Sequence, residues 1–435
     1  MNWDKMFARR AEQMKRTAVR ELLKVAARPE IISFAGGLPA ADLFPMAAVN
    51  EAVTRVFNRF GGMSLQYGQT EGLAELREWL AAEFTTQALD SLNSPFGGPS
   101  NWSVQPENIL ITSGAQQALD LLGRVLLEDG DRVVVENPTY LALLSAWRPH
   151  GVTFLPVPSD EQGMKAETLD HLSSQSPKLV YVTPNFQNPQ GTTLAFDRRI
   201  ELLGFAARCG AAIVEDNPYG ELRYHGESLP HLLALEPGLT GPPPPSQTGP
   251  HSVIYVGSFS KVLMPGLRIG WIIAAPEVIE KLVQAKQAAD LHTNSLGQHV
   301  VLELLTTGFL DEFLPRLKHT YRQRRDAMLN ALDRSFPSDV SWTRPDGGMF
   351  LMARLASVDA TALLPEALAQ GVAYVPGEEF HLNGEGRNTM RLNFTNATPE
   401  QIETGIKRLA KSLEHARRAA PEVLGEGVPR AQQLA

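Results

Sequence analysis

Short apolar runs alternate with helix-like segments along the middle of the chain, from Ile109 onward. The runs are ILITS, RVVVEN, VTFLPV, LVYVTP, AAIVED and VIYV, and a further apolar run begins at Ile269. The pattern predicts helices between them at about residues 115–128, 140–147, 196–208 and 276–291. Strands that alternate with helices are typical of a mainly parallel sheet covered by helices on both faces. The sequence therefore predicts an α/β fold.

The pattern changes toward both ends of the chain. From about Val340 to Leu413, short strand-like runs (GGMFLMARL, VAYVPG and TMRLNF) are separated by helices, which indicates a smaller α+β domain. Residues 1–28 are basic and helix-prone, with an irregular apolar face that favours packing against another surface. The stretches 90–103 and 237–252 are rich in residues that favour loops, and we expect surface insertions there. The expected division is an arm at 1–30, a large domain at 46–320, a small domain formed by 31–45 and 321–413, and a flexible tail at 414–435.

Length, net charge and cysteine content limit the classes of protein to which the chain can belong. A length of 435 residues exceeds one typical core and suggests two or more domains. The balance of 40 Lys and Arg against 48 Asp and Glu gives a net charge of −8, which argues against a general nucleic-acid binder. Cys209 is the only cysteine, so no intramolecular disulfide can form, and a reducing compartment is favoured. No apolar run approaches membrane-spanning length and no signal peptide is evident, so the cytoplasm is the expected location.

The stretch VIYVGSFSKVLMPGLRIGW, residues 253–271, carries the most concentrated candidate chemistry. Ser258, Ser260, Lys261 and Arg268 lie at or near the ends of two predicted strands. Ligands of open α/β sheets bind at the carboxyl ends of strands. Two hydroxyls, an amine and a guanidinium there suit a phosphate-bearing carbonyl compound that could bond covalently to the lysine. The alternative is a lysine in a surface loop, which is the usual place for a single lysine.

Two further strand ends carry candidate residues. Ser113, Gly114, Ala115 and Gln116 connect a buried strand to a helix, where exposed backbone N–H groups would suit a phosphate. A tight strand–helix turn explains the same residues equally well. Asp216 ends the apolar run AAIVED, and a carboxylate in that setting is costly unless a cation pairs with it. Helix capping or a structural salt bridge is the alternative for Asp216.

Several other polar residues are weaker candidates. Asn188 precedes a proline, which is usually only a turn signal, and Tyr219 could reach the same site as Asp216 although core tyrosines are commoner. Arg391 alternates with Met390, Leu392 and Phe394 and could face inward as a carboxylate fork, or outward as a solvated residue. The Gly36–Gly37 pair indicates backbone that runs close to a bulky group.

Taken together and in this order, these motifs resemble the fold-type I, pyridoxal 5′-phosphate-dependent class I/II aminotransferases. The resemblance runs from about Ile31 to Leu413, and SFSKVLMPGLRIGW is its most specific motif. ITSGAQQAL, NFQNPQG, VEDNPYGE and MRLNF support it. The resemblance implies a large domain with a mainly parallel seven-stranded sheet, a smaller α+β domain, no metal ion, and a homodimer that acts on small amino acids and 2-oxo acids.

The resemblance also implies a role for each candidate residue. Lys261 would bond covalently to the cofactor and move the substrate proton. Asp216 would pair with the ring nitrogen and keep it protonated. The remaining assignments are as follows: Ser113, Gly114, Ala115, Gln116, Ser258, Ser260 and Arg268 for the phosphate; Asn188 and Tyr219 for the ring oxygen; Tyr140 for the ring face; Arg391, with Gly37, Asn188 and Tyr67, for the substrate; and Tyr67 also for the phosphate of the neighbouring subunit.

Within this family, the chain resembles the 2-aminoadipate aminotransferases of lysine biosynthesis. The segments TAVRELLK, ISFAGGLPAADLFP, LQYGQTEG and QAKQAADLHTN carry that likeness. In that group an arginine of the N-terminal arm contacts the distal carboxylate of acidic substrates, and Arg20 holds the matching position, although Lys15, Arg16 and Lys24 lie near it. Relatives of the group also accept leucine, aromatic amino acids and kynurenine.

Two other functions compete with this interpretation. A β-lyase, decarboxylase or synthase could use the same fold and cofactor, but the Arg391 segment and the aminoadipate-like segments favour amino-group transfer. A transcriptional regulator with an aminotransferase-like domain would carry a DNA-binding domain ahead of ISFAGG. Only some thirty residues precede that motif, and the net charge is negative, so we expect an enzyme.

Overall fold

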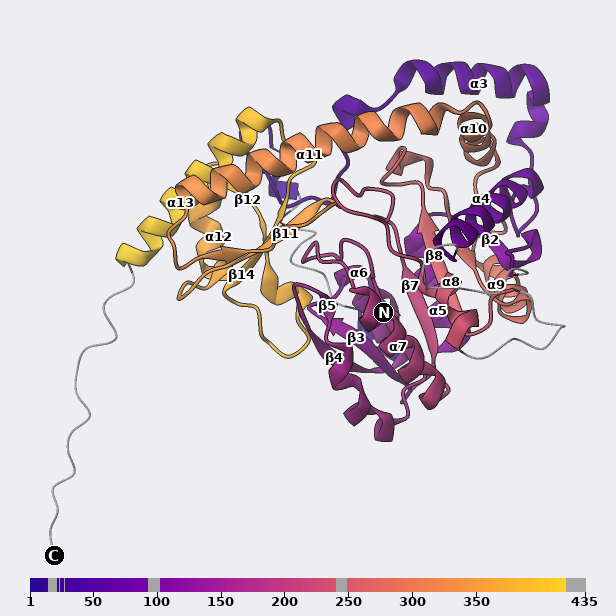
Figure 1. The fold of residues 1–435 in the computed structure, drawn as a ribbon, viewed down its shortest axis with the longest axis horizontal. Helices are drawn as coiled ribbons and strands as arrows, with labels where there is room; N and C mark the ends of the chain where they lie inside the picture. Colours follow the sequence, from indigo (N-terminus) through magenta and orange to yellow (C-terminus); the bar gives the residue numbers. More distant parts are fainter. Residues whose placement is uncertain (15–21, 23, 27, 93–101, 240–248, 420–435) are drawn as a thin grey trace, which may run out of the picture.

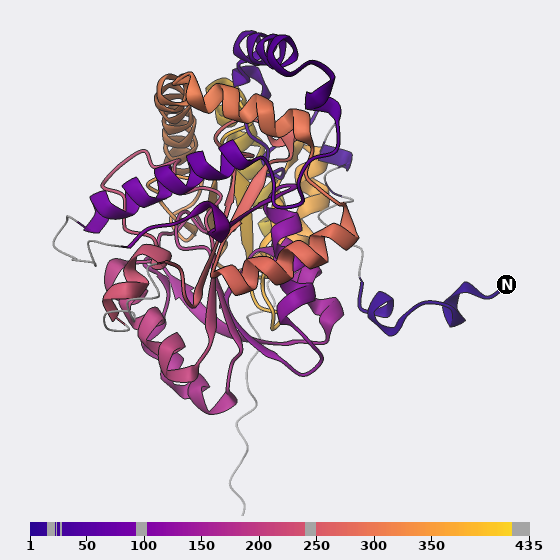
Figure 2. The same cartoon turned by 90° about the vertical axis from the view of Figure 1, so that its right-hand side faces the viewer.

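The computed structural model describes residues 1–14, 22, 24–26, 28–92, 102–239 and 249–419 (Figure 1). Most of the two predicted insertions, the residue Arg20 and the chain after Ala419 lie outside these described residues. The N-terminal end of the chain extends away from the body of the molecule (Figure 2), whereas α1 (Arg9–Glu12) lies against the short helix η5 (Arg148–His150). None of the helices in the described part of the chain combines the length and apolar character needed to cross a membrane.

The large sheet has eight strands in the order β2-β9-β8-β7-β6-β3-β4-β5. Neighbouring strands from β8 through β4 run parallel, whereas β9 is antiparallel to both of its neighbours. The predicted seven strands are present, and the two-residue β5 adds an eighth by pairing antiparallel with β4. The bounds are β2 Ile109–Thr112, β3 Arg132–Asn137, β4 Thr153–Asp160, β5 Gly163–Met164, β6 Leu179–Val182, β7 Ala212–Asp216, β8 Val253–Ser258 and β9 Gly270–Ile273.

Alternate residues of these strands enter two separate cores, as the period of a strand requires. Leu110, Val133 and Val135 enter one core, and Ile111 and Val134 enter the other. Both faces are apolar, which explains why the strands read as continuous hydrophobic runs in the sequence. Helices α5 (Ala115–Leu126), α6 (Leu141–Trp147) and α9 (Pro276–Ala289) cover the first face. Helices α4 (Ala74–Leu92), α7 (Phe196–Cys209), α8 (Leu232–Leu239) and α10 (Ser295–Thr306) cover the second.

The second sheet is antiparallel, with the order β10-β11-β14-β13, and has its own core. Met390, Leu392 and Phe394 enter that core, as the alternation around Arg391 predicts. A separate parallel pair joins β1 (Ile32–Ser33) to β12 (Val372–Ala373). The other bounds are β10 Ser341–Trp342, β11 Phe350–Arg354, α12 Ala360–Ala369, β13 Val375–Pro376, β14 Thr389–Asn393 and α13 Pro399–Ala419.

Some elements differ from the sequence-based expectation. Helix α13 continues past Leu413 to Ala419, because Ala416 packs on the small core and Arg417 forms an ion pair with Asp339 at 2.8 Å. Helix α8 occupies the start of the predicted 237–252 loop. Helix α3 (Met46–Phe60) packs against α10, and the sequence pattern did not predict it.

The 27-residue helix α11 (Phe309–Ser335) runs along both domains (Figure 1). Its buried residues fasten the segment that passes from β1 to α3. The Tyr321 hydroxyl accepts the Ala40 N–H at 3.0 Å, and Arg324 donates to Asp42 Oδ2 at 2.7 Å and to the Thr395 carbonyl at 2.5 Å. The bonds to Ala40 and Asp42 fix the backbone that follows Gly37, which faces the cavity described below.

Replacing Arg324 with Met should lower the free energy of unfolding by about 2–3 kcal/mol, because two charge-assisted hydrogen bonds of a buried group are lost. Arg316→Met on the same helix is the matched control. Its side chain is 79% exposed and its ion pair with Glu312 is 3.7 Å long, so a loss below about 0.5 kcal/mol is expected. Chemical denaturation measures both variants. Equal losses would show that Arg324 does not act as a buried anchor.

Candidate active site

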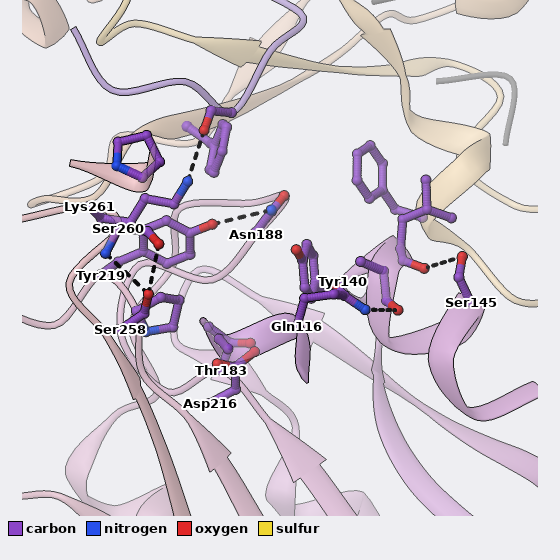
Figure 3. A pocket seen from close by; sticks show the side chains of 18 of the residues that line it. Gln116, Tyr140, Ser145, Thr183, Asn188, Asp216, Tyr219, Ser258, Ser260 and Lys261 are labelled. Atoms are coloured by element: carbon purple, nitrogen blue, oxygen red, sulfur yellow. Dashed lines mark hydrogen bonds between the residues drawn. The ribbon is translucent and has the colours of Figure 1, made fainter. Parts of the chain in front are cut away.

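A cavity of about 460 Å³ lies at the carboxyl ends of β6, β7 and β8, where the two domains meet. It brings together most of the candidate residues from the sequence: Gly37, Ala115, Gln116, Tyr140, Asn188, Asp216, Tyr219, Ser258, Ser260, Lys261, Arg268 and Arg391. Ser113, Gly114 and Tyr67 are not part of its lining. Arg20 lies outside the described residues. Figure 3 shows how the labelled side chains converge on this cavity from both sides.

Lys261 follows β8 and reaches across to the segment between the domains. Its Nζ donates a hydrogen bond to the Gly37 carbonyl at 2.9 Å (Figure 3). Burial, together with the positive charges of Arg391 and Arg268, lowers the pKa of Lys261 to about 8. A larger fraction of the amine is therefore neutral near pH 8 than in an exposed lysine, and a neutral amine is both a nucleophile and a base.

Asp216 ends β7 at the floor of the cavity. The Tyr181 hydroxyl donates to Asp216 Oδ2 at 2.6 Å, whereas the buried Oδ1 has no hydrogen-bond partner among the described residues. Burial raises the pKa of Asp216 to about 6, and the Tyr181 hydrogen bond opposes that rise. An unpartnered buried carboxylate oxygen is costly. The cation expected beside Asp216 is not found in the described part of the chain, so this oxygen suits a protonated group of a ligand.

Arg391 reaches the opposite wall of the cavity from β14. Its guanidinium donates to Asn188 Oδ1 at 2.9 Å and to the Ala35 carbonyl at 2.6 Å. It also lies over the rings of Phe350 at 4.4 Å and Phe380 at 5.0 Å. Burial lowers the pKa of Arg391 to about 10, and its Nε has no hydrogen-bond partner within the described ranges. A guanidinium held by neutral groups in this way suits a carboxylate ligand.

The turn between β2 and α5 faces the mouth of the cavity. Gly114 has φ +80° at the start of α5, a conformation that favours glycine. A Cβ atom at this position would lie 2.6 Å from Arg268 Nη2, so only glycine leaves room for the guanidinium. Arg268 Nη2 donates to the Ser113 carbonyl at 2.7 Å. Backbone N–H groups at a helix start beside an arginine form a suitable phosphate site.

On the floor of the cavity, a hydrogen bond from the Ser260 N–H to the Ser258 hydroxyl closes a local turn. The Ser258 and Ser260 hydroxyls lie 2.9 Å apart, and Ser260 N–H donates to Ser258 Oγ at 3.1 Å (Figure 3). Both hydroxyls face the same cavity as Arg268. Asn188 donates weakly to the Tyr219 hydroxyl at 3.4 Å, which places two polar groups on a further wall.

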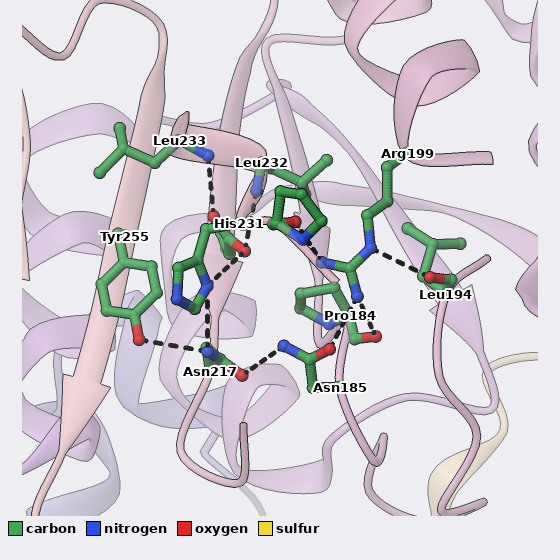
Figure 4. A network of polar contacts seen from close by, with 11 residues as sticks. Pro184, Asn185, Leu194, Arg199, Asn217, His231, Leu232, Leu233 and Tyr255 are labelled. Carbon is green, nitrogen blue, oxygen red and sulfur yellow. Dashed lines mark hydrogen bonds and ion pairs between the residues drawn. The ribbon is translucent and has the colours of Figure 1, made fainter. Parts of the chain in front are cut away.

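A buried polar network behind the cavity fixes the loops that carry Asn188 and Tyr219 (Figure 4). Arg199 donates to the Leu194 carbonyl at 3.0 Å and to Asn185 Oδ1 at 2.7 Å. Asn185 in turn donates to Asn217 Oδ1 at 2.9 Å. Because Asn217 follows Asp216 directly, this network ties the end of β7 to the loop after β6.

Tyr67 lies apart from the cavity of its own chain. Its side chain is 78% exposed, and its ring meets His292 edge-on at 5.6 Å. Several large apolar side chains are also exposed on the described surface, namely Leu38, Met46, Phe57, Met63, Leu65 and Leu291. Exposed apolar surface of this extent is typical of a protein–protein contact.

Sequence reasoning missed some residues of the site. Tyr181, which holds Asp216, looked like an ordinary residue of a buried strand. Phe350 and Phe380 come from distant segments and gave no local signal. Thr183 also lines the cavity, two residues after Tyr181 on the same side of the chain, and that spacing was a usable signal.

Comparison with known proteins identifies close relatives. Residues 29–409 match the family described as aminotransferase class I and II. Aromatic-amino-acid aminotransferase 1 of Thermococcus litoralis is 42% identical over 95% of this chain and 95% of its own length. The 2-aminoadipate transaminase of Thermus thermophilus is 42% identical over 95% of this chain and 98% of its own length. The solved structure of an alpha-aminoadipate aminotransferase from Thermus thermophilus, in complex with N-(5′-phosphopyridoxyl)-L-leucine, has a TM-score of 0.85 at 40% identity and covers 96% of this chain and 100% of that chain.

The raised pKa of Asp216 predicts a pH-dependent cost to stability. Its pKa is raised from 3.8 to about 6, so the folded protein binds this proton more tightly than the unfolded chain. The ligand-free protein therefore loses stability as pH rises through about 4 to 6 and does not regain it above that window. Asp216→Asn removes this titration. The stability of the Asp216→Asn variant relative to wild type should rise by at most ~3 kcal/mol between about pH 4 and 6 and should then stay constant.

Denaturation of the ligand-free proteins from about pH 2.5 to 8 measures this difference and also covers the range in which the control titrates. Asp160→Asn is a control of opposite sign, because the Arg198 hydrogen bond lowers the pKa of Asp160. The stability that Asp160 contributes is present above pH 4 and is lost as pH falls. A difference between Asp216→Asn and wild type that does not change with pH would contradict the prediction.

Proposed function

The chain belongs to the aminotransferase class I and II family, and on that premise we propose that it moves the amino group between 2-aminoadipate or glutamate and a 2-oxo acid. It is an aminotransferase that uses pyridoxal 5′-phosphate. One observation carries the proposal for the site: Lys261, the unpartnered Oδ1 of Asp216 and the guanidinium of Arg391 all open on one cavity.

The residues of the cavity fit the cofactor. Asp216 Oδ1 suits the protonated ring nitrogen, and the Gly114 turn with Ser258, Ser260 and Arg268 suits the phosphate. When bound, the cofactor supplies an electron sink for the charge that develops when the substrate Cα loses a proton. Asn188 and Tyr219 are placed to bind the ring oxygen.

Lys261 has two tasks in the proposed reaction. It would hold the cofactor covalently. When free, its Nζ would take up and give back the proton of the substrate Cα, because its lowered pKa makes the neutral amine available. The Gly37 carbonyl, 2.9 Å from Nζ, provides an acceptor that orients the amine.

The other residues bind and orient the reactants. Arg391 binds the substrate α-carboxylate, since its guanidinium is held rigidly by Asn188, Ala35 and two aromatic rings. Tyr140, at the start of α6, covers one face of the ring and excludes water there. Holding the reacting atoms in this way contributes to the rate by removing orientational freedom.

Substrate selection is proposed to involve the N-terminal arm. Lys261, Arg268 and Arg391 are the cations that the described residues contribute to the lining of the cavity, and each has another task. A distal carboxylate therefore needs a cation from elsewhere, and Arg20 is the candidate. Leu22 and Ala26 of the same arm pack into one cluster with Phe380, which lines the cavity. The relative named for aromatic amino acids supports a range that includes aromatic donors. The solved relative in complex with N-(5′-phosphopyridoxyl)-L-leucine supports leucine as a further donor.

A homodimer completes the proposal. Tyr67 and the exposed Met63 and Leu65 beside it would form part of the subunit contact, with Tyr67 reaching the phosphate bound by the partner. The proposal keeps the domain boundaries given above, except that helix α13 extends the small domain to Ala419. It also keeps a cytoplasmic location and a place in lysine biosynthesis. Sedimentation of the purified protein at micromolar concentration tests the dimer, and a monomer would contradict the role of Tyr67.

Replacing Lys261 with Ala should abolish both activity and the absorbance band of the lysine-bound cofactor, because no other amine forms that bond. The spectrum of the protein mixed with pyridoxal 5′-phosphate measures the second effect. Lys281→Ala, at an exposed lysine of α9, is the control and should retain the band. A band that persists in the Lys261 variant would refute the assignment.

Replacing Arg20 with Ala should raise KM for 2-aminoadipate and glutamate at least about tenfold, while KM for leucine changes little, since only acidic side chains lose a charge partner. Amino transfer to 2-oxoglutarate or 2-oxoadipate measures each donor. Lys24→Ala, an exposed basic residue of the same arm, is the matched control. Equal losses on all donors would make Arg20 structural.

A further inference from the structure

Lys286 on α9 is a fully buried lysine that the reaction described above does not use. Its Nζ donates to Asp290 Oδ1 at 2.6 Å and to Gln117 Oε1 at 3.1 Å. Lysine is rarely buried completely, and burying an ammonium is costly unless the charge is paired. The position of Lys286 therefore calls for an explanation beyond packing.

The groups that Lys286 contacts also hold Ser113. Gln117 Nε2 donates to Asp290 Oδ2 at 2.6 Å, and Ser113 Oγ donates to the same oxygen at 3.2 Å. The Ser113 N–H donates to Gln117 Oε1 at 2.7 Å. We name Lys286, Asp290 and Gln117 the Ser113 brace.

The brace determines which groups of the turn remain available to a ligand. The N–H and hydroxyl of Ser113 are engaged by the brace, and its carbonyl accepts a hydrogen bond from Arg268 at 2.7 Å. Ser113 therefore lies outside the cavity lining, although the sequence motif suggested that it contacts the phosphate. The Gly114 N–H is also engaged, since it donates to the Thr112 carbonyl at 2.8 Å. With Ser113 and Gly114 fixed in this way, the following N–H group at Ala115 and the Arg268 guanidinium are held in place.

The charges of Lys286 and Asp290 also affect how the site would bind a phosphate. Asp290 is an anion one side chain away from the proposed phosphate site, and its side chain is 29% exposed. An uncompensated anion there would repel a phosphate. Lys286 pairs with Asp290 from the buried side, so the brace can use a carboxylate as an anchor without adding a net negative charge.

We infer that Lys286 is a positioning residue for the cofactor phosphate, which acts by anchoring Ser113 through Gln117 and Asp290 and by neutralising Asp290. The inference rests on the proposed placement of the phosphate beside Gly114 and Arg268. It concerns affinity for the phosphate group and not the chemistry at Lys261.

Binding of pyridoxal 5′-phosphate and of pyridoxal to the cofactor-free protein tests the inference, because pyridoxal has the same ring and aldehyde but no phosphate. Lys286→Met should raise the dissociation constant of pyridoxal 5′-phosphate about tenfold or more and that of pyridoxal no more than about twofold. Adding Asp290→Asn to that variant removes the uncovered charge and should restore the affinity to within about threefold of wild type. Equal losses for both ligands, or an unchanged affinity for pyridoxal 5′-phosphate, would overturn the inference.

Two further variants complete the design. Gln117→Leu changes no charge and frees the Ser113 N–H, so it should weaken pyridoxal 5′-phosphate selectively even if Lys286→Met does not fold. A Gln117→Leu variant that binds both ligands like wild type would contradict the anchoring role. Lys178→Met is the matched control, because Lys178 pairs with Asp131 at 2.7 Å before β6, at the opposite end of the strands, and both affinities should remain unchanged.

The wild-type protein provides the separate check on the proposed function. If it binds pyridoxal as tightly as pyridoxal 5′-phosphate, the placement of the phosphate is wrong. If it prefers pyridoxal 5′-phosphate and the Lys286 and Gln117 variants do not alter that preference, the placement stands and the brace is wrong.

Discussion

The burial of the Asp216 carboxylate with one oxygen left unpartnered is the constraint on which the site depends. A buried anion is unfavourable, and the protein offsets only part of that cost through the Tyr181 hydroxyl. In the proposed function, the remaining oxygen pairs with the protonated ring nitrogen of the cofactor. The ligand-free protein would then be less stable so that the cofactor binds more tightly, a balance often found at active sites.

Polar residues that do not line the cavity hold that carboxylate and its neighbours in place. The Arg199–Asn185–Asn217 network fixes the loops behind Asp216. Arg324 and Tyr321 of α11 fasten the backbone that follows Gly37, at Ala40 and Asp42. A site accurate enough for proton transfer needs such support, because side chains on unsupported loops would sample too many positions.

The sequence predicted the parts of this protein that depend on local pattern. Lys261 and Asp216 stand at the ends of strongly apolar strands, and Arg391 alternates with core residues, so their strand placement and shared cavity were foreseeable. Tyr181 and Phe380 were not, because their roles arise from contacts between segments far apart in the chain. Ser113 is a second example of what the sequence could not predict. Its motif located the turn, but only the tertiary contacts with Asp290 and Gln117 show where its side chain points.

The division of the site between two sheets has a consequence for how the protein is made. The strands of the large sheet all lie between residues 109 and 273, so that sheet can form while the rest of the chain is still being synthesised. Arg391 bonds to Ala35 across 356 residues and to Asn188 across 203. Contacts of such long range form late, since the intervening chain must first be ordered. A nascent chain halted before β14 would therefore present a finished sheet with Lys261 and Asp216 in place, yet would lack Arg391, the residue proposed to bind the substrate carboxylate.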